Sequence, residues 1–120
     1  MADRKTLQVV AETRAFSEDI EAMLSQAERD AVITSIALAP EGGDLIQGAG
    51  GLRKRRIRLP GRGKSGGARV ITFCLGEDFP VYALFVFAKN EREDLSPDQT
   101  RALMRIVADI KARARTRRRR

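Results

Sequence analysis

The sequence predicts an α+β fold, in which a small, mostly antiparallel sheet of four strands is combined with an N-terminal helical hairpin and a C-terminal helix. Three observations predict this class. Apolar residues recur at helical spacing near both ends of the chain, two central segments alternate between apolar and polar residues, and Val81 to Ala88 is apolar on both faces. A chain of 120 residues is long enough for one core. We therefore expect a single domain over residues 1–116 and a disordered basic tail over residues 117–120.

The N-terminal third is expected to form one strand and two helices. Thr6 to Glu12 has the β-branched content of a short strand. From Ala15 onward, apolar residues at helical spacing predict an amphipathic helix. Ser25 and Glu28 have the spacing of a capping box, so a second helix is expected to begin there and to end before Pro40. These two helices are predicted to pack as a hairpin.

The central part is predicted to be a β-hairpin that follows a glycine-rich connector over residues 44–51. Leu52 to Leu59 alternates as a strand with Ile57 and Leu59 facing the core. The basic side chains expected on its opposite face are Lys54, Arg56 and Arg58. Residues 60–67 are too rich in glycine for regular structure, and Arg69 to Leu75 resumes as a strand. A long basic loop therefore joins the two strands.

The C-terminal part is expected to supply a central strand and a covering helix. Val81 to Ala88 is apolar on both faces, as in a strand with a neighbour on each side. Ser96, Pro97 and Gln99 combine a cap, a first-turn proline and the partner of a capping box. We expect the helix that they begin to lie over the sheet.

Positive charge is concentrated in two blocks of the sequence. The chain has 23 Lys and Arg and 16 Asp and Glu, a net charge of +7. Residues 53–69 hold eight basic residues, residues 111–120 hold seven more, and all the acidic residues lie elsewhere. Nine of the ten glycines lie between residues 42 and 67, which indicates close approach of the backbone to a ligand. This pattern favours a localised anion site on the hairpin over a solvated hairpin face, which charge alone would also permit.

The composition argues against several other classes of protein. No apolar run approaches the ~20 residues of a membrane-spanning helix, and the N-terminus has no apolar signal segment, so we expect a cytoplasmic protein without a membrane partner. Histidine is absent and Cys74 is the only cysteine, so no metal site is expected, and Cys74 is interpreted as a packed side chain rather than a nucleophile. Gly61, Gly63 and Gly66 match a dinucleotide-binding pattern, but a strand follows them where that site needs a helix.

Two long segments of the chain resemble the RelE/HigB family of bacterial toxins from type II toxin-antitoxin systems. They read GDLIQGAGGLRKRRIRLPGRGKSGGARVI and VYALFVFAKNEREDLS, and a closing helix follows. The resemblance implies a RelE-like toxin that cuts mRNA in the A site of the 30S ribosomal subunit, against 16S rRNA. It also implies inhibition by a cognate helix-turn-helix antitoxin. No metal or other cofactor is implied, because relatives use lysines and arginines to assist attack of the ribose 2′-hydroxyl on the adjacent phosphate.

The resemblance also assigns candidate residues. The catalytic candidates are Lys54, Lys64, Arg62 and Arg69. The RNA-binding candidates are Arg53, Arg56, Arg58, Phe87 and Lys89. Neighbouring cations disfavour the protonated form of a lysine, so Lys54 or Lys64 is predicted to be the general base. Arg62 and Arg69 would stabilise the charged phosphorane. Many relatives have tyrosine in place of Phe87, which here can only stack on a base.

Two alternatives remain open from the sequence. A ParE-like relative would share the fold but poison a DNA topoisomerase, and a basic RNA-binding module would bind ribosomes without cutting mRNA. Both alternatives keep the positive patch on the hairpin.

Overall fold

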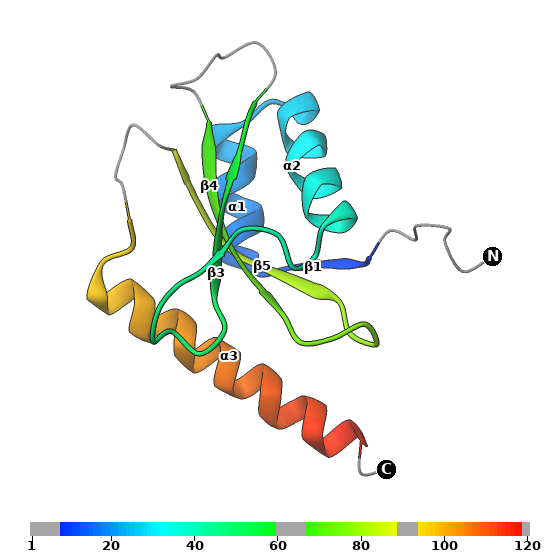
Figure 1. The fold of residues 1–120 in the computed structure, drawn as a ribbon. Coiled ribbons are helices and arrows are strands. Elements are labelled where there is room, and N and C mark those ends of the chain that lie inside the picture. The colour runs from blue at the N-terminus through cyan, green and yellow to red at the C-terminus, as the bar shows by residue number, and fades with distance from the viewer. Residues whose placement is uncertain (1–7, 60–66, 89–93, 119–120) are drawn as a thin grey trace, which may run out of the picture.

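The computed structural model describes residues 8–59, 67–88 and 94–118 and consists of a five-stranded sheet with three helices (Figure 1). The strands are β1 (Val10–Glu12), β2 (Asp44–Leu45), β3 (Arg53–Ile57), β4 (Ala68–Cys74) and β5 (Val81–Ala88). They lie in the order β1-β5-β4-β3-β2, in which β1 is parallel to β5 and the other neighbours are antiparallel. The predicted α+β class is therefore confirmed. The sheet has five strands rather than four, because β2 forms within the expected connector and pairs with β3.

The second and third helices begin where their capping sequences predict. They are α1 (Arg14–Met23), α2 (Gln26–Leu38) and α3 (Pro97–Arg118). At the start of α2, the Glu28 amide donates to Ser25 Oγ at 3.2 Å and the Ser25 amide donates to Glu28 Oε1 at 2.9 Å. Ser96 and Gln99 form the equivalent pair before α3, at 3.1 and 2.9 Å. α3 continues through Arg118, so residues 117 and 118 of the expected tail are helical, and residues 119–120 lie outside the described part of the chain.

The sheet separates two apolar clusters. On one face, α1 and α2 bury side chains such as Phe16, Ile20 and Ile36 against β3, β4 and β5. On the other face, α3 contributes Leu103 and Val107 to a second cluster (Figure 1). β5 is paired on both edges and contributes to both clusters, as its apolar sequence predicts. Among the helices that the structure describes, none has the length and apolar character needed to cross a bilayer.

An irregularity in β5 is tied to the start of α1. The pairing between β4 and β5 shifts between Ile71 and Thr72, so that Leu84 has no partner residue on β4. The Thr13 amide donates to the Ala83 carbonyl at 3.1 Å, and Thr13 Oγ1 donates to the Leu84 carbonyl at 3.2 Å. Thr13 Oγ1 also accepts from the Phe16 amide, which caps α1. One threonine thus fixes both the bulge and the helix that follows β1.

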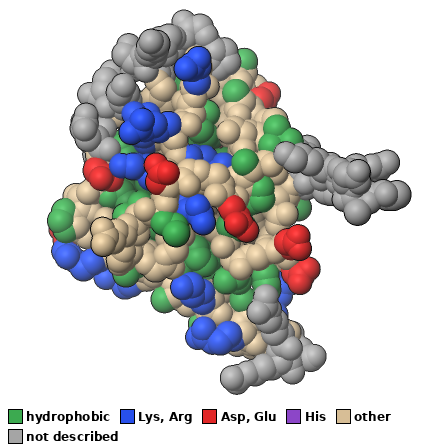
Figure 2. Space-filling view, viewed as in Figure 1, with side chains coloured by type: hydrophobic (Ala, Val, Ile, Leu, Met, Phe, Trp, Pro, Cys, Tyr) green, Lys and Arg blue, Asp and Glu red, His purple; other side chains and the backbone are tan. Residues whose placement is uncertain are grey.

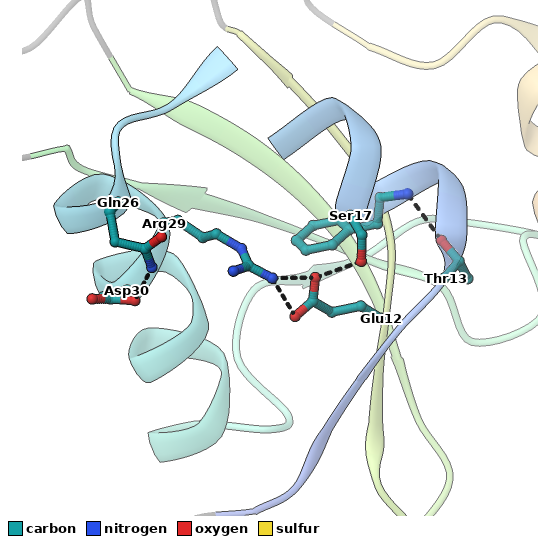
Figure 3. A network of polar contacts seen from close by, with 7 residues as sticks. Glu12, Thr13, Ser17, Gln26, Arg29 and Asp30 are labelled. Atoms are coloured by element: carbon teal, nitrogen blue, oxygen red, sulfur yellow. Dashed lines mark hydrogen bonds and ion pairs between the residues drawn. The ribbon is translucent and has the colours of Figure 1, made fainter. Parts of the chain in front are cut away.

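A polar network joins β1 to both N-terminal helices (Figure 3). Arg29 Nη2 from α2 lies 3.2 Å from each carboxylate oxygen of Glu12, and Ser17 Oγ from α1 donates to Glu12 Oε1 at 2.8 Å. The Arg29 side chain is only 29% exposed. Its charge is therefore compensated chiefly by Glu12, at the point where three elements meet.

Replacing Glu12 with alanine is expected to lower the free energy of unfolding by about 1–3 kcal/mol, because the partly buried Arg29 charge loses its acceptor. Urea unfolding of the purified protein measures the change. Glu18→Ala, which removes an exposed ion pair with Arg14 on α1, is the matched control and should cost less than about 1 kcal/mol. Equal losses from the two substitutions would contradict the structural role of Glu12.

Candidate nucleic-acid interface

The alternation of β3 directs its cations to one face of the sheet. Ile57 and Leu59 are buried in the cluster under α1 and α2, as predicted. Leu52 lies in the opposite cluster under α3. Side chains at even positions of β3 share the Leu52 face, because successive residues of a strand point to opposite sides. Lys54, Arg56 and Arg58 therefore face the α3 side together, in agreement with the sequence.

Arg56 on β3 stands directly opposite Arg69 on β4. Opposed side chains of an antiparallel pair have Cβ atoms about 4.5–5.5 Å apart, and like charges at such positions are destabilising. Within residues 8–59, 67–88 and 94–118, no carboxylate forms an ion pair with Arg56, Arg58 or Arg69. Figure 2 shows Lys and Arg side chains gathered on the part of the surface where β3 ends and β4 begins. We call Lys54, Arg56, Arg58 and Arg69 the cation row.

Lys54 differs from the rest of the cation row because it has an acidic partner. Its Nζ lies 3.3 Å from Asp94 Oδ1, just before α3, and its side chain is 25% exposed. Asp94 also accepts a hydrogen bond from the Leu95 amide at 2.9 Å. That hydrogen bond, together with Lys54, lowers the pKa of the Asp94 carboxyl. Sequence reasoning missed Asp94, since only the fold brings the start of α3 next to β3.

Two further arginines of β3 have structural contacts on the opposite face. Arg55 is 5% exposed, and its guanidinium donates to the carbonyls of Ala39 at 2.8 Å and Pro40 at 3.2 Å. Its positive charge therefore caps the C-terminal end of α2, which has no basic residue in its last turn. Burial and the nearby charge of Arg53 lower the pKa of Arg55. Arg53, an RNA-binding candidate, donates to the Gly43 carbonyl at 3.2 Å and lies outside the cation row.

Gly43 is required where the connector approaches β3. Its φ is +89°, a conformation that side chains rarely adopt, and a Cβ atom there would lie 2.7 Å from the Lys54 carbonyl oxygen. The glycine therefore lets β2 pack against the strand that carries the cation row, which is one local reason for the glycine-rich composition of this segment.

Phe87 is buried, whereas the sequence prediction required a ring that RNA can reach. Its side chain is 2% exposed and belongs to the apolar cluster beneath α3, with its ring centroid 5.9 Å from that of Phe85. A base has no access to the ring in this arrangement. We therefore correct the expectation that Phe87 stacks on RNA and assign it to the core.

Several predicted residues lie outside the described part of the chain. These are Arg62 and Lys64 of the basic loop, Lys89 after β5, and the glycines of the discounted dinucleotide pattern. Cys74 is described and is partly buried beside the cluster under α1 and α2. Burial and the charge of Glu41 raise the pKa of its thiol, which disfavours the nucleophilic thiolate.

Comparisons with known proteins agree with the fold. A family model described as "RelE toxin of RelE / RelB toxin-antitoxin system" matches residues 12–117. A solved structure of a mutant E. coli toxin RelE in the free state is similar, with a TM-score of 0.53 and 14% sequence identity. The similarity covers 73% of this chain and 90% of that chain. At this level of identity, the structural likeness concerns the fold.

Proposed function

This chain belongs to the RelE toxin family, and from this membership we propose that it is a ribosome-dependent endoribonuclease. In this proposal it cleaves mRNA in the ribosomal A site, inhibits translation, and is neutralised by a cognate antitoxin. The observation that carries the proposal is the Arg56–Arg69 pair. Two like charges opposed across strands, without an ion-pairing carboxylate in the described residues, lower the stability of the free protein and favour binding of a phosphate group.

The proposed reaction needs cations more than any other group. The ribose 2′-hydroxyl loses its proton and its oxygen attacks the adjacent phosphorus, while the bond from phosphorus to the 5′-oxygen breaks. The products are a 2′,3′-cyclic phosphate and a 5′-hydroxyl, and the leaving oxygen takes a proton. Negative charge rises on the phosphoryl oxygens during this step. Arg56 and Arg69, held on adjacent strands, would stabilise that charge from fixed positions.

The contacts of Lys54 argue against its role as the general base. Lys54 Nζ forms an ion pair with Asp94 at 3.3 Å, whereas a general base needs a free lone pair directed at the proton that it accepts. We therefore propose that Lys54 acts as a fixed cation on the phosphate or as the proton donor to the leaving oxygen. The sequence-based assignment of a general base then falls to Lys64, which lies outside the described residues.

The two roles of Lys54 predict different results for Lys54→Arg. If Lys54 is a fixed cation, the arginine variant should keep cleavage within about tenfold of wild type, while Lys54→Ala should lose about 100-fold or more. Single-turnover cleavage of mRNA on programmed ribosomes measures both variants. If Lys54→Arg is as slow as Lys54→Ala, the fixed-cation role is wrong, because arginine keeps the positive charge. That result would support the role of proton donor, since arginine cannot donate a proton at neutral pH.

A translation reaction with a defined message tests the proposed function. The 5′ ends of the message are mapped after addition of the purified protein, with and without ribosomes. We expect new 5′ ends within the reading frame only when ribosomes are present. Adding Arg56→Gln/Arg69→Gln protein in place of wild type should remove them.

Other outcomes of the same experiment point to the alternatives. An intact message with bound protein on the ribosome would indicate a non-catalytic binding module. An intact message with DNA damage in cells would indicate a topoisomerase poison. Cuts in the free message would show a nuclease that does not need the ribosome.

A further inference from the structure

A second feature on the α3 side lies far from the cation row. A hollow of about 360 Å³ opens between the C-terminal half of α3 and the turn that joins β4 to β5. Phe79 of the turn and Tyr82 of β5 line it on one side, and Arg113 and Arg117 line it from α3. Pro97, at the start of α3 near Lys54, is roughly 24 Å from Arg113 along the helix axis at 1.5 Å per residue. The hollow is therefore separate from the proposed cleavage site.

Arg113 and Arg117 line the hollow, and their guanidinium groups can donate further hydrogen bonds. Arg113 Nε lies 3.2 Å from Asp109 Oδ2, which orients the guanidinium, and its two terminal nitrogens form no hydrogen bond with the described residues. Arg117 forms no ion pair with a carboxylate of the described residues, and both arginine side chains are exposed. By contrast, Lys111 donates to the Gly50 carbonyl at 3.1 Å and lies 5.6 Å from the Phe73 ring centroid, so it fastens α3 to the connector.

The helix dipole does not explain the positive charge at the C-terminal end of α3. A dipole favours cations in the last turn only, whereas basic residues without any acid extend from Lys111 to the end of the chain. Arg113 and Arg117 are also four residues apart on α3, a spacing at which like charges repel. Ala114 is the last buried residue among those of α3 whose burial is described, and Arg115, Thr116 and Arg117 are exposed, so packing does not explain the charge of this turn. Figure 2 shows basic side chains along this lower part of the molecule.

The chemistry of the hollow favours RNA over a protein partner. An aromatic side chain beside two guanidinium groups offers a stacking surface for a base and charge for its phosphate, as in recognition of unpaired nucleotides. Protein interfaces also use tyrosine and arginine, but they place them in and around a fully buried apolar core. Ile106 is the only large apolar side chain of α3 that is well exposed among the described residues, and it does not line the hollow.

We propose that this hollow binds an unpaired nucleotide of RNA, with the base against Tyr82 and the phosphate held by Arg113 and Arg117. The inference deepens the proposed function and rests on it for the source of that RNA, which would be the ribosome or its message. Binding at this point would anchor the toxin at a distance from the bond that it cleaves.

The experiment measures RNA binding without cleavage. Fluorescence anisotropy of a labelled single-stranded oligonucleotide is recorded with Arg56→Gln/Arg69→Gln protein, in which the cation row is neutralised. In this background, Tyr82→Ala should weaken binding by about tenfold or more, as loss of one stacked base does. Tyr82→Phe keeps the ring and should bind like its parent, and circular dichroism checks that each variant is folded.

The arginines are tested in the same background. Arg113→Gln/Arg117→Gln should reduce the slope of log affinity against log salt by about 0.7, since the two arginines share one phosphate and each neutralised phosphate of a single strand contributes about 0.7. Arg14→Gln, a remote exposed arginine on α1, should leave the slope unchanged.

Three results would overturn the proposal. They are equal binding of an RNA duplex and the single strand, no effect of Tyr82→Ala in folded protein, and preference for a polyglutamate peptide, which would assign the hollow to an acidic protein. Failure of the cleavage assay alone would count against the proposed function and leave these binding results standing.

Discussion

Arg69→Ala is expected to slow ribosome-dependent mRNA cleavage by about 100-fold to 1000-fold, the loss seen when one fixed donor to a developing negative charge is removed. Arg69 has this effect because it stands opposite Arg56 on the face of the sheet that carries Lys54 and Arg58. The same substitution relieves repulsion between two cations, so the free energy of unfolding should stay the same or rise slightly. Cleavage is therefore expected to slow without a loss of stability.

Single-turnover cleavage and urea unfolding together check this result. Arg69→Lys should recover part of the rate, since it restores the charge without the planar pair of donors. Arg14→Ala is the matched control, because Arg14 is 92% exposed on α1, on the other side of the sheet. Wild-type cleavage by folded Arg69→Ala protein would remove Arg69 from the site.

Phe87→Ala is expected to cost about 3–5 kcal/mol of unfolding free energy, the usual loss when a buried phenylalanine is truncated. The ring lies in the cluster between the sheet and α3, so its removal leaves a cavity there. Phe87→Leu fills most of the volume and should cost less. Both variants keep the cation row, and their folded fractions should bind RNA like wild type.

Chemical denaturation followed by binding titrations at low temperature separates the two roles of Phe87. A stable Phe87→Leu protein that binds RNA tenfold more weakly would show that the ring contacts RNA. Loss of stability with unchanged affinity supports its assignment to the core.

Local signals in the sequence predicted much of the fold. The capping boxes at Ser25 and Ser96 located the starts of α2 and α3, because each pairs a hydroxyl and a longer acceptor at a fixed spacing. The alternation of β3 likewise gave the correct face for Lys54 and Arg56. That pattern depends only on the pleat of a strand, which needs no knowledge of its neighbours.

Contacts between residues that are far apart in the sequence were not predicted. The pairing of Arg56 with Arg69 needs the register of β3 and β4, and the contact of Lys54 with Asp94 needs the path of α3. Phe87 is a different case, because the sequence of β5 already indicated burial on both faces. The RNA-stacking prediction instead followed the tyrosine that many relatives have at this position. The structure shows that Phe87 is buried, as the apolar sequence of β5 indicated.

The parallel pairing of β1 with β5 has a consequence for how the protein is made. Val10 pairs with Val81, so β1 has no partner in the sheet until β5 has been translated. Nascent chains that end before β5 should therefore be sensitive to protease, and resistance should appear only once β5 has emerged. A protein proposed to stop translation would thus be unable to complete its sheet until β5 has been synthesised.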